Sequence, residues 1–282
     1  MSSTTSNQQK DSPANAPAAV VVPLRLTMRS TTIDPAIYRM VVVENEYRLP
    51  PRFESGDLIL DIGAHIGFFA LAVLARGAGR VVCVEADREN YEIARTNLAG
   101  FIEAGRVGLL HGAAWRSDDN EDTLYHAGYP RLRGGLLNTG GGSIHTAGGG
   151  EPTPKIPFDE IIDEETRKSG ARVRLLKLDC EGSEFPILST SSRLHLIDEI
   201  AGEYHEFGGP FDDLSPPFDL PGFRSLTIES LLDLMHDHGF EVSHRRHIAG
   251  YDKRLKPERL GIFFAKRRAQ ASHLSPTQGG NS

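Results

Sequence analysis

The feature that most constrains the fold is a strand–turn–helix unit between residues 58 and 77. Residues 58–62 (LILDI) are a short apolar run, the turn GAHIG follows, and FFALAVLARG continues with apolar residues on almost every face. Such a helix is expected to be buried against a sheet, and Gly77 and Gly79 are expected to end it. A buried strand that leads through a glycine turn into a buried helix predicts an α/β fold with a mostly parallel sheet.

The alternation of strands and helices continues to the C-terminal region. Thr227 is predicted to cap the last helix, and because Ser230 stands where a capping box has Glu or Gln, no full box is expected. No helix separates the last two strands, so they are expected to pair as a hairpin at the sheet edge. Strands are predicted at 80–85, 107–114, 173–179, 197–207, 240–248 and 259–267, and helices at 88–100, 156–169, 183–189 and 228–238.

Low-complexity ends flank one predicted domain, which covers residues 23–268. Residues 1–22 and 269–282 offer almost nothing to bury and are predicted to be disordered tails. Within the domain, residues 134–150 contain eight glycines in seventeen positions, which disfavours a regular element. We expect this segment to be a mobile substrate loop, with an inert insertion as the alternative.

Composition and charge exclude several classes of protein. The formal net charge of −7 gives no electrostatic case for binding nucleic acid or acidic membranes. No apolar run approaches the ~18–20 residues of a membrane helix, and the first residues lack the pattern of a secretory signal, so a cytoplasmic protein is expected. Cys83 and Cys180 both lie in or beside apolar runs, which predicts free thiols rather than a disulfide.

The turn 61–67 (DIGAHIG) is a candidate ligand site, because open α/β sheets bind ligands beyond the carboxyl ends of their strands. Gly63 and Gly67 would let a ligand approach the backbone, and Glu85, at the end of the next strand, suits two ribose hydroxyls. The spacing G-x-x-x-G disfavours a dinucleotide, which needs G-x-G-x-x-G. Asp61 suits an ammonium group. A nucleoside that carries an amino acid, such as S-adenosylmethionine, fits these features.

Several stretches together resemble the FkbM family of class I methyltransferases. They are LILDIGAHIGFFAL with VVCVEADRENYEIARTNLAG, then IPFDEIID, LLKLDCEGSEFPIL and GEYHEF, in this order between roughly residues 40 and 267. The resemblance implies a Rossmann-like α/β fold with a seven-stranded, mostly parallel sheet, helices on both faces and a C-terminal edge hairpin. It also implies S-adenosylmethionine as the cofactor and methyl transfer to oxygen, on a sugar or secondary metabolite.

One position departs from the family pattern, which commonly has Asn where this sequence has His65. Histidine still donates a hydrogen bond, but its side chain is larger. The cofactor-binding residues that we expect from the turn, the strand ends and the resemblance are Asp61, Gly63, Ala64, His65, Gly67, Glu85, Ala86, Ala113 and Asp179.

The candidate catalytic residues come from two neighbouring strands. Asp179 ends one predicted strand and Glu181 lies on the turn after it, while Glu203 and His205 lie two residues apart on the next strand and so share a face. We expect His205 to be the general base for a hydroxyl acceptor, with the three carboxylates orienting the acceptor or the cofactor's ammonium. Glu184 is predicted to be only a first-turn acid favoured by the helix dipole.

Several alternatives stay open at this point. Asp179, Glu181, Glu203 and His205 could instead bind a divalent cation that lowers the pKa of the hydroxyl, or Glu181 could be the base. A non-catalytic protein that binds S-adenosylmethionine is a further alternative. SPPF at 215–218 resembles a motif of nucleic-acid base methyltransferases but lies in the wrong loop. We therefore expect a small-molecule or glycan acceptor, no nucleic acid and no membrane, and the sequence leaves the oligomeric state open.

Overall fold

The computed structural model describes residues 26–118, 123–126, 128–129, 131–132, 135–142, 150–206, 226–246 and 259–269. Residues 1–22, nearly all of the predicted C-terminal tail, the SPPF motif and half of the glycine-rich segment lie outside these ranges. Within them, none of the helices is both long and apolar enough to cross a membrane.

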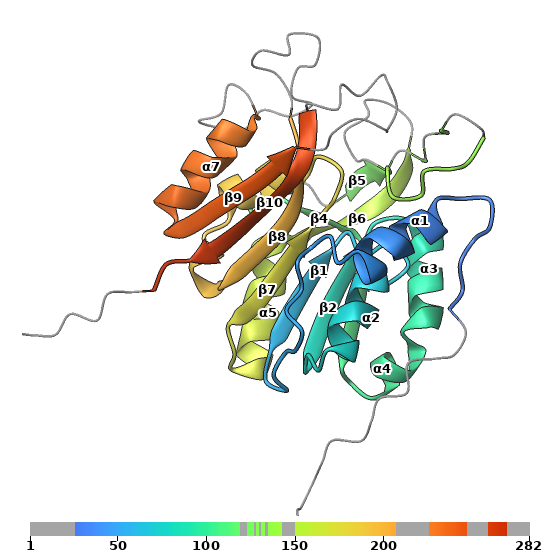
Figure 1. The fold of residues 1–282 in the computed structure, drawn as a ribbon, viewed down its shortest axis with the longest axis horizontal. Helices are drawn as coiled ribbons and strands as arrows, with labels where there is room; N and C mark the ends of the chain where they lie inside the picture. Colours follow the sequence, from blue (N-terminus) through green and yellow to red (C-terminus); the bar gives the residue numbers. More distant parts are fainter. Residues whose placement is uncertain are drawn as a thin grey trace, which may run out of the picture.

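A seven-stranded sheet forms the centre of the molecule (Figure 1). Its strand order is β3-β2-β1-β7-β8-β10-β9, and the first five strands run parallel. β10 is antiparallel to β8 and pairs with β9 as the predicted edge hairpin, which is thereby confirmed. The strands are β1 (Leu58–Ile62), β2 (Arg80–Glu85), β3 (Val107–His111), β7 (Val173–Leu178), β8 (Glu199–His205), β9 (Phe240–Arg246) and β10 (Leu260–Arg267).

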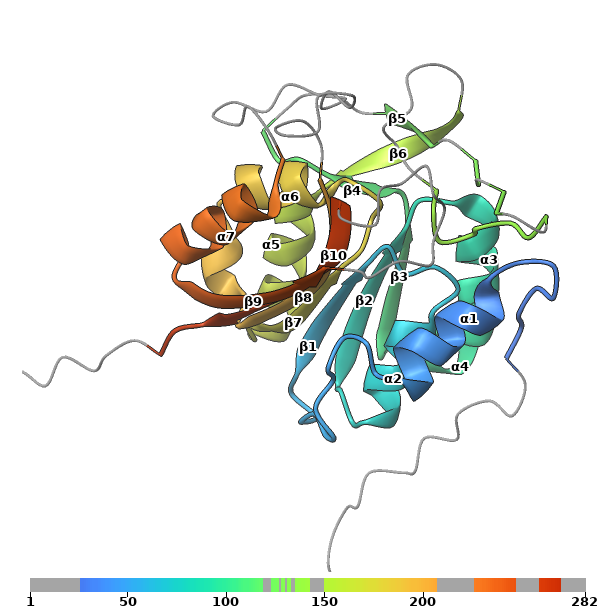
Figure 2. The ribbon, with the colours of Figure 1, turned by 45° about the horizontal axis from the view of Figure 1, so that its top comes forward.

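Helices cover both faces of this sheet, as predicted (Figure 2). One face carries α1 (Asp34–Tyr38), the π-helical turn η1 (Arg39–Val43), α2 (Phe68–Ala75), α3 (Arg88–Asn97) and α4 (Ala99–Glu103). The other carries α5 (Phe158–Ser169), α6 (Glu184–Thr190), the 3-10 turn η2 (Leu194–Leu196) and α7 (Ile228–Asp237). Each face has its own cluster of buried apolar side chains. The alternation read from the sequence therefore reflects two separate cores around one sheet.

Helix caps follow the sequence with one correction. Asp87 caps α3 by accepting a hydrogen bond from the Asn90 amide at 2.8 Å. Thr227 caps α7, but the expectation that no full capping box forms is wrong. The Ser230 hydroxyl accepts a hydrogen bond from the Thr227 amide at 3.0 Å, because serine is long enough to perform the task of Glu or Gln here.

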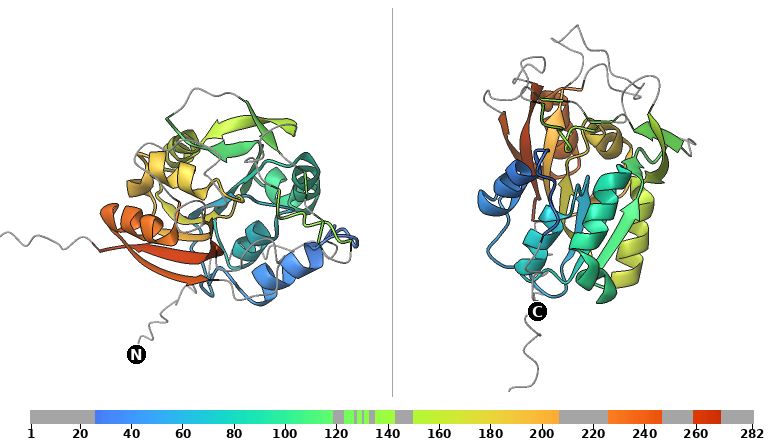
Figure 3. Two further views of the ribbon diagram at one scale, coloured as in Figure 1. Left: turned by 90° about the horizontal axis from the view of Figure 1, so that it is seen from above. Right: turned by 90° about the vertical axis from the view of Figure 1, so that its right-hand side faces the viewer.

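A second, three-stranded sheet lies beside the main sheet (Figure 3). The prediction of one strand at 107–114 is wrong, because the chain leaves the main sheet at Gly112 and the residues after it belong to the small sheet. A Cβ at Gly112 would lie 2.7 Å from the side chain of Ile156. Ile156 and Pro157, predicted as helix, end a strand instead, because they pair with the residues after Gly112. This sheet has the order β4-β6-β5, with β4 (Ala113–Trp115), β5 (Thr123–His126) and β6 (Glu151–Pro157).

Candidate active site

One cavity of ≈360 Å³ opens at the carboxyl ends of β1, β2, β7 and β8. This volume is in the range of small-molecule sites, and the position agrees with the ligand crevice of open α/β sheets. A wall from α1 and η1, including Ile37 and Met40, lies opposite the strand ends. Segments that are far apart in sequence therefore enclose the site.

The glycines of the turn after β1 are required by their close neighbours. Gly63 has φ +76°, and a Cβ there would lie 1.8 Å from the carbonyl oxygen of Asp179. Gly67 has φ +91°, and its Cβ would lie 2.9 Å from Leu98. Gly63 lines the cavity, while Gly67 packs against Leu98 outside it. These two positions therefore require glycine because of their protein neighbours. The sequence alone had indicated only the approach of a ligand as the reason.

Glu85 lines the cavity at the carboxyl end of β2. It is 6% exposed and accepts hydrogen bonds from the amides of His65 at 2.7 Å and Asp87 at 2.9 Å. Burial raises the pKa of Glu85 to about 7. Its two carboxylate oxygens have more lone pairs than these amides use, so it retains the capacity to accept from two ribose hydroxyls. Ala86 and Ala113 line the same end.

Asp61 lies beneath the turn, outside the residues that line the cavity. Its side chain is completely buried, and the carboxylate forms an ion pair with Lys177 at 3.4 Å. Burial raises the pKa of Asp61 to about 6 although Lys177 opposes this. Lys177 also donates to the carbonyls of Ile62 and Gly63. Ala64, too, is buried away from the cavity surface, and cofactor contacts by Asp61 and Ala64 stay predictions.

His65 contacts the cavity and also a buried polar network. Its Nε2 lies 3.0 Å from the Thr139 hydroxyl and 3.5 Å from a carboxylate oxygen of Asp34. Burial lowers the pKa of His65 even though Asp34 opposes this, which favours the neutral imidazole. The ring thereby connects the turn after β1 to the first residue of α1 and to Thr139.

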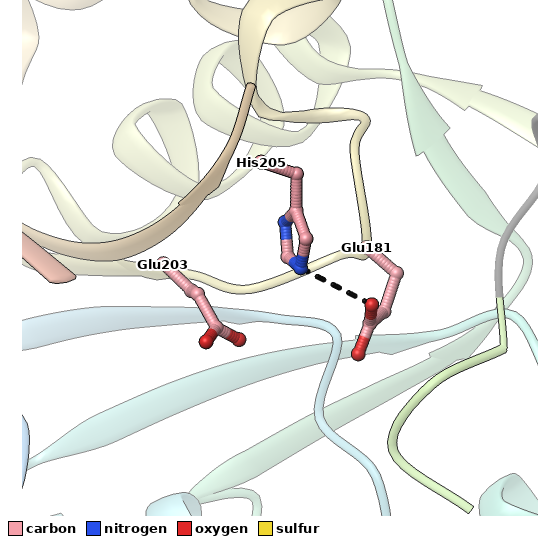
Figure 4. Close-up of side chains that lie close together, drawn as sticks. All are labelled: Glu181, Glu203 and His205. Atoms are coloured by element: carbon pink, nitrogen blue, oxygen red, sulfur yellow. Dashed lines mark ion pairs between the residues drawn. The ribbon is translucent and has the colours of Figure 1, made fainter. Parts of the chain in front are cut away.

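Four predicted catalytic residues meet at the other end of the cavity, which Asp179, Glu181, Glu203 and His205 all line. His205 Nε2 lies 3.2 Å from Glu181 Oε2 (Figure 4). One ligand atom from each of Glu181, Glu203 and His205 lies within 4.8 Å of the others. The structure thus brings together the side chains that the sequence placed on two neighbouring strands.

Burial and mutual charge shift the pKa values of this cluster. Burial opposes the charging of His205, but Glu184 and Glu181 outweigh it and raise the pKa of His205 well above its usual range. Burial raises the pKa of Glu181, and burial together with Asp179 raises that of Glu203 well above its usual range. Carboxylates that gather at one buried spot repel one another, so this end of the cavity attracts positive charge.

Glu184 does more than the predicted stabilisation of a helix dipole. It is fully buried and accepts from the amides of Cys180 and Gly182, both at 2.9 Å, which shapes the turn that presents Glu181. Its Oε2 lies 3.5 Å from His205 Nδ1. The sequence signal for this role is the spacing: Glu184 follows Glu181 by three residues, so the side chain of Glu184 can reach back over the turn to the backbone amides.

Tyr47 is a site residue that no pattern in the sequence indicated. Its hydroxyl donates to Asp179 Oδ2 at 2.7 Å, and the residue is 6% exposed. Although burial raises the pKa of Asp179, Lys177 and this hydrogen bond hold it below its ordinary value. Tyr47 precedes Asp179 by 132 positions, so no local spacing connects them.

The two cysteines are free thiols, as predicted: Cys83 is buried and Cys180 is half-buried.

This strand order, the antiparallel β10 and the cavity beyond the strand ends are those of the Rossmann-like class I methyltransferase fold, whose methyl donor is S-adenosylmethionine. The sequence matches the methyltransferase FkbM domain over residues 61–242. The chain therefore belongs to the FkbM methyltransferase family. The donor set fits the cofactor, since Glu85 can hold a ribose and the carboxylates at the other end suit a sulfonium.

Solved structures of low sequence identity resemble the chain. The FkbM methyltransferase from Methylobacillus flagellatus KT is 18% identical with a TM-score of 0.45, and the match covers 81% of this chain but 47% of that one. An O-methyltransferase from Bacillus cereus, in complex with SAH, is 14% identical over 85% and 84% of the two chains, with a TM-score of 0.40. Precorrin-6y C5,15-methyltransferase from Geobacter metallireducens GS-15 is 12% identical over 86% and 93%, also with a TM-score of 0.40. No curated protein matches the sequence.

Proposed function

We propose that this methyltransferase acts on a hydroxyl oxygen of a small-molecule or glycan acceptor. The observation that carries the proposal is that one cavity joins Glu85 at its nucleoside end to the Glu181–His205 pair at its other end. An alcohol is a weak nucleophile until its proton is removed, whereas an amine attacks in its neutral form. A carboxylate paired with a histidine is therefore better matched to a hydroxyl than to an amine.

In the proposed reaction, the cavity holds the acceptor oxygen in line with the methyl group of the cofactor. When bound, S-adenosylmethionine supplies the methyl group, with Glu85 holding the ribose and the turn at Gly63 lying against the cofactor. Asp179 and Glu203 border the space beside Glu181 and His205, where they can orient the acceptor. The Glu181 carboxylate, paired with His205, would take the hydroxyl proton as the acceptor oxygen takes the methyl group, and the electron pair of the carbon–sulfur bond would stay on sulfur.

The acceptor end of the cavity is acidic, which favours a small acceptor over nucleic acid. Glu44 and Glu46 line it in addition to the four residues of the cluster. Glu44 pairs with Arg39 at 2.7 Å and Glu46 with Arg245 at 3.8 Å, so these two arginines already face carboxylates. A polyanionic backbone needs cations along its path, and this wall opposes it.

Two measurements test the proposed function. Isothermal titration with SAH should give one binding site per chain, and an assay with S-adenosylmethionine should show methyl transfer to at least one member of a panel of hydroxylated compounds. Failure of SAH to bind would overturn the proposal. Binding without transfer to any acceptor would favour a non-catalytic protein instead.

The substitution His205→Ala tests whether the two ends of the cavity have different roles, one in turnover and the other in cofactor binding. We expect it to reduce turnover by at least about 100-fold, because general acid–base assistance contributes roughly 10²–10⁴-fold. The dissociation constant for SAH should stay within about twofold, since His205 lies beside Glu181 and away from Glu85. A collapse of SAH affinity in this variant would assign His205 to the cofactor site.

A further inference from the structure

We propose that Glu181, Glu203 and His205 form a binding site for a divalent cation with oxygen and nitrogen ligands, of which Mn²⁺ is the probe. The chemical use of the cation rests on the proposed function, whereas its binding does not. The three ligand atoms lie within 4.8 Å of one another, and His205 Nε2 lies 3.2 Å from Glu181 Oε2. Neighbouring ligands of an octahedral ion at about 2.1 Å are about 3 Å apart, so small side-chain rotations suffice.

The three side chains reach one space from different elements (Figure 4). Glu203 and His205 extend from β8 on the same side of the strand, and Glu181 extends from the turn after β7. β7 and β8 are hydrogen-bonded neighbours in the parallel sheet, so the backbone fixes the spacing of the set. Two carboxylates and one imidazole are ligands that suit Mn²⁺ or Mg²⁺ better than a soft cation.

The second nitrogen of His205 supports this inference independently of the cluster. Nδ1 lies 3.5 Å from Oε2 of Glu184, whose side chain is completely buried and fixed by two backbone amides. Histidines that bind metals commonly present their other ring nitrogen to a carboxylate, which fixes the ring and its tautomer. Here that arrangement leaves Nε2 directed at Glu181 and the cavity.

The cation would change how the acceptor loses its proton. An acceptor hydroxyl whose oxygen contacts the cation has a lowered pKa, so its proton passes to water. The oxygen then bonds to the methyl carbon, the carbon–sulfur bond breaks, and its electron pair stays on sulfur. A single positive ion would also offset the repulsion among the carboxylates that surround this end of the cavity.

The first test is direct binding of Mn²⁺ to the full-length protein after treatment with EDTA and gel filtration. Electron paramagnetic resonance should show one bound Mn²⁺ per chain, with or without SAH. Glu203→Gln and His205→Gln should each weaken binding by more than about tenfold, and Glu184→Gln, acting through His205, by about 10–100-fold. Glu44→Gln is the matched control, since it removes an exposed carboxylate from the same cavity wall and should retain binding.

Two results would overturn the cation site: no bound Mn²⁺ in the wild-type protein, or Mn²⁺ affinity unchanged in both Glu203→Gln and His205→Gln. A methyl-transfer rate unaffected by EDTA would overturn the chemical use of the cation. The wild-type measurement requires no variant to fold, and circular dichroism establishes which variants are native. If Mn²⁺ binds through these three residues but no acceptor is methylated, the cation site stands and the proposed function fails.

Discussion

Three acids that look alike in the sequence, Asp179, Glu181 and Glu184, have different surroundings in the folded chain. Asp179 accepts from Tyr47 at 2.7 Å, Glu181 faces His205 at 3.2 Å, and Glu184 closes the turn between them through two backbone amides. The sequence separated Asp179 and Glu181 from Glu184 by position alone. It missed the contact of Glu184 with His205 because that contact depends on how β8 lies beside the turn.

At this scale, Tyr47→Phe should destabilise the protein by about 1–3 kcal/mol, because it removes a buried hydrogen bond to a charged group. Urea unfolding followed by circular dichroism measures the change. Tyr125→Phe is the control: Tyr125 is 57% exposed, and its substitution should change the free energy of unfolding by less than about 0.5 kcal/mol. Equal effects of the two substitutions would contradict the assigned role of Tyr47.

The pKa of about 7 for Glu85 predicts a pH dependence of nucleoside binding. Ribose hydroxyls donate to the ionised carboxylate, so binding requires deprotonation and affinity rises with pH. Between pH 6 and pH 8 the ionised fraction of a group with this pKa increases about tenfold, and the association constant for adenosine should rise by the same factor. Adenosine is the probe because it lacks the amino-acid end of the cofactor.

The control for this pH dependence is 2′,3′-dideoxyadenosine, which lacks both hydroxyls and should bind weakly with little change between pH 6 and pH 8. Titration calorimetry at both pH values measures the two nucleosides. An equal slope for both would show that a group other than Glu85 titrates.

At the scale of elements, glycines decide where strands end and how closely they approach. Gly63 allows β1 to turn against the end of β7, and Gly112 allows the chain to leave β3 for the small sheet. The alternation of strands and helices was predictable, because it depends on local apolar patterns. The division of residues 107–115 between two sheets was not, because it depends on pairing with β6, some forty residues later.

Gly63→Ala should therefore be severe, since its Cβ would lie 1.8 Å from a backbone oxygen at a positive φ. We expect a loss of at least about 3 kcal/mol of stability, and loss of SAH binding in any folded fraction. Gly100→Ala in α4 is the matched control, because its Cβ would have no neighbour within 4 Å. Alanine there should be neutral or stabilise by up to about 1 kcal/mol. Thermal unfolding distinguishes the two, and similar midpoints would contradict the prediction.

At the scale of the whole molecule, a buried polar network joins segments that are far apart in sequence. Asp34 accepts from Arg29 at 3.0 Å and from the hydroxyl of Thr139 at 2.8 Å, while Thr139 also contacts His65. Arg29 in turn donates to Asn90 at 2.6 Å. The segment before α1, the turn after β1, α3 and the segment 135–142 are thereby connected beside the cavity.

Asp34→Asn should weaken this network, because Asp34 is fully buried and its charge is paired with Arg29. Removing one partner of a buried ion pair costs on the order of 3 kcal/mol, and we expect that loss in urea unfolding. The exposed pair Arg39–Glu44 provides the comparison, since Glu44→Gln should cost less than about 1 kcal/mol. The reverse order of the two effects would show that the network contributes little.

The sequence by itself determined the α/β class, the edge hairpin, the free thiols and the position of the site beyond the strand ends. These features depend on local periodicity, on turn residues and on the rule that parallel strands present their carboxyl ends to one edge. Only the tertiary structure decided that Tyr47 donates a hydrogen bond to Asp179 and that Glu184 lies against His205. It also decided that the side chain of Asp61 pairs with Lys177 and does not line the cavity. Each of these contacts joins side chains across neighbouring strands or distant segments. The strength of such an interaction depends on the distance between the atoms and on their burial, and the spacing of residues along the chain does not encode either quantity.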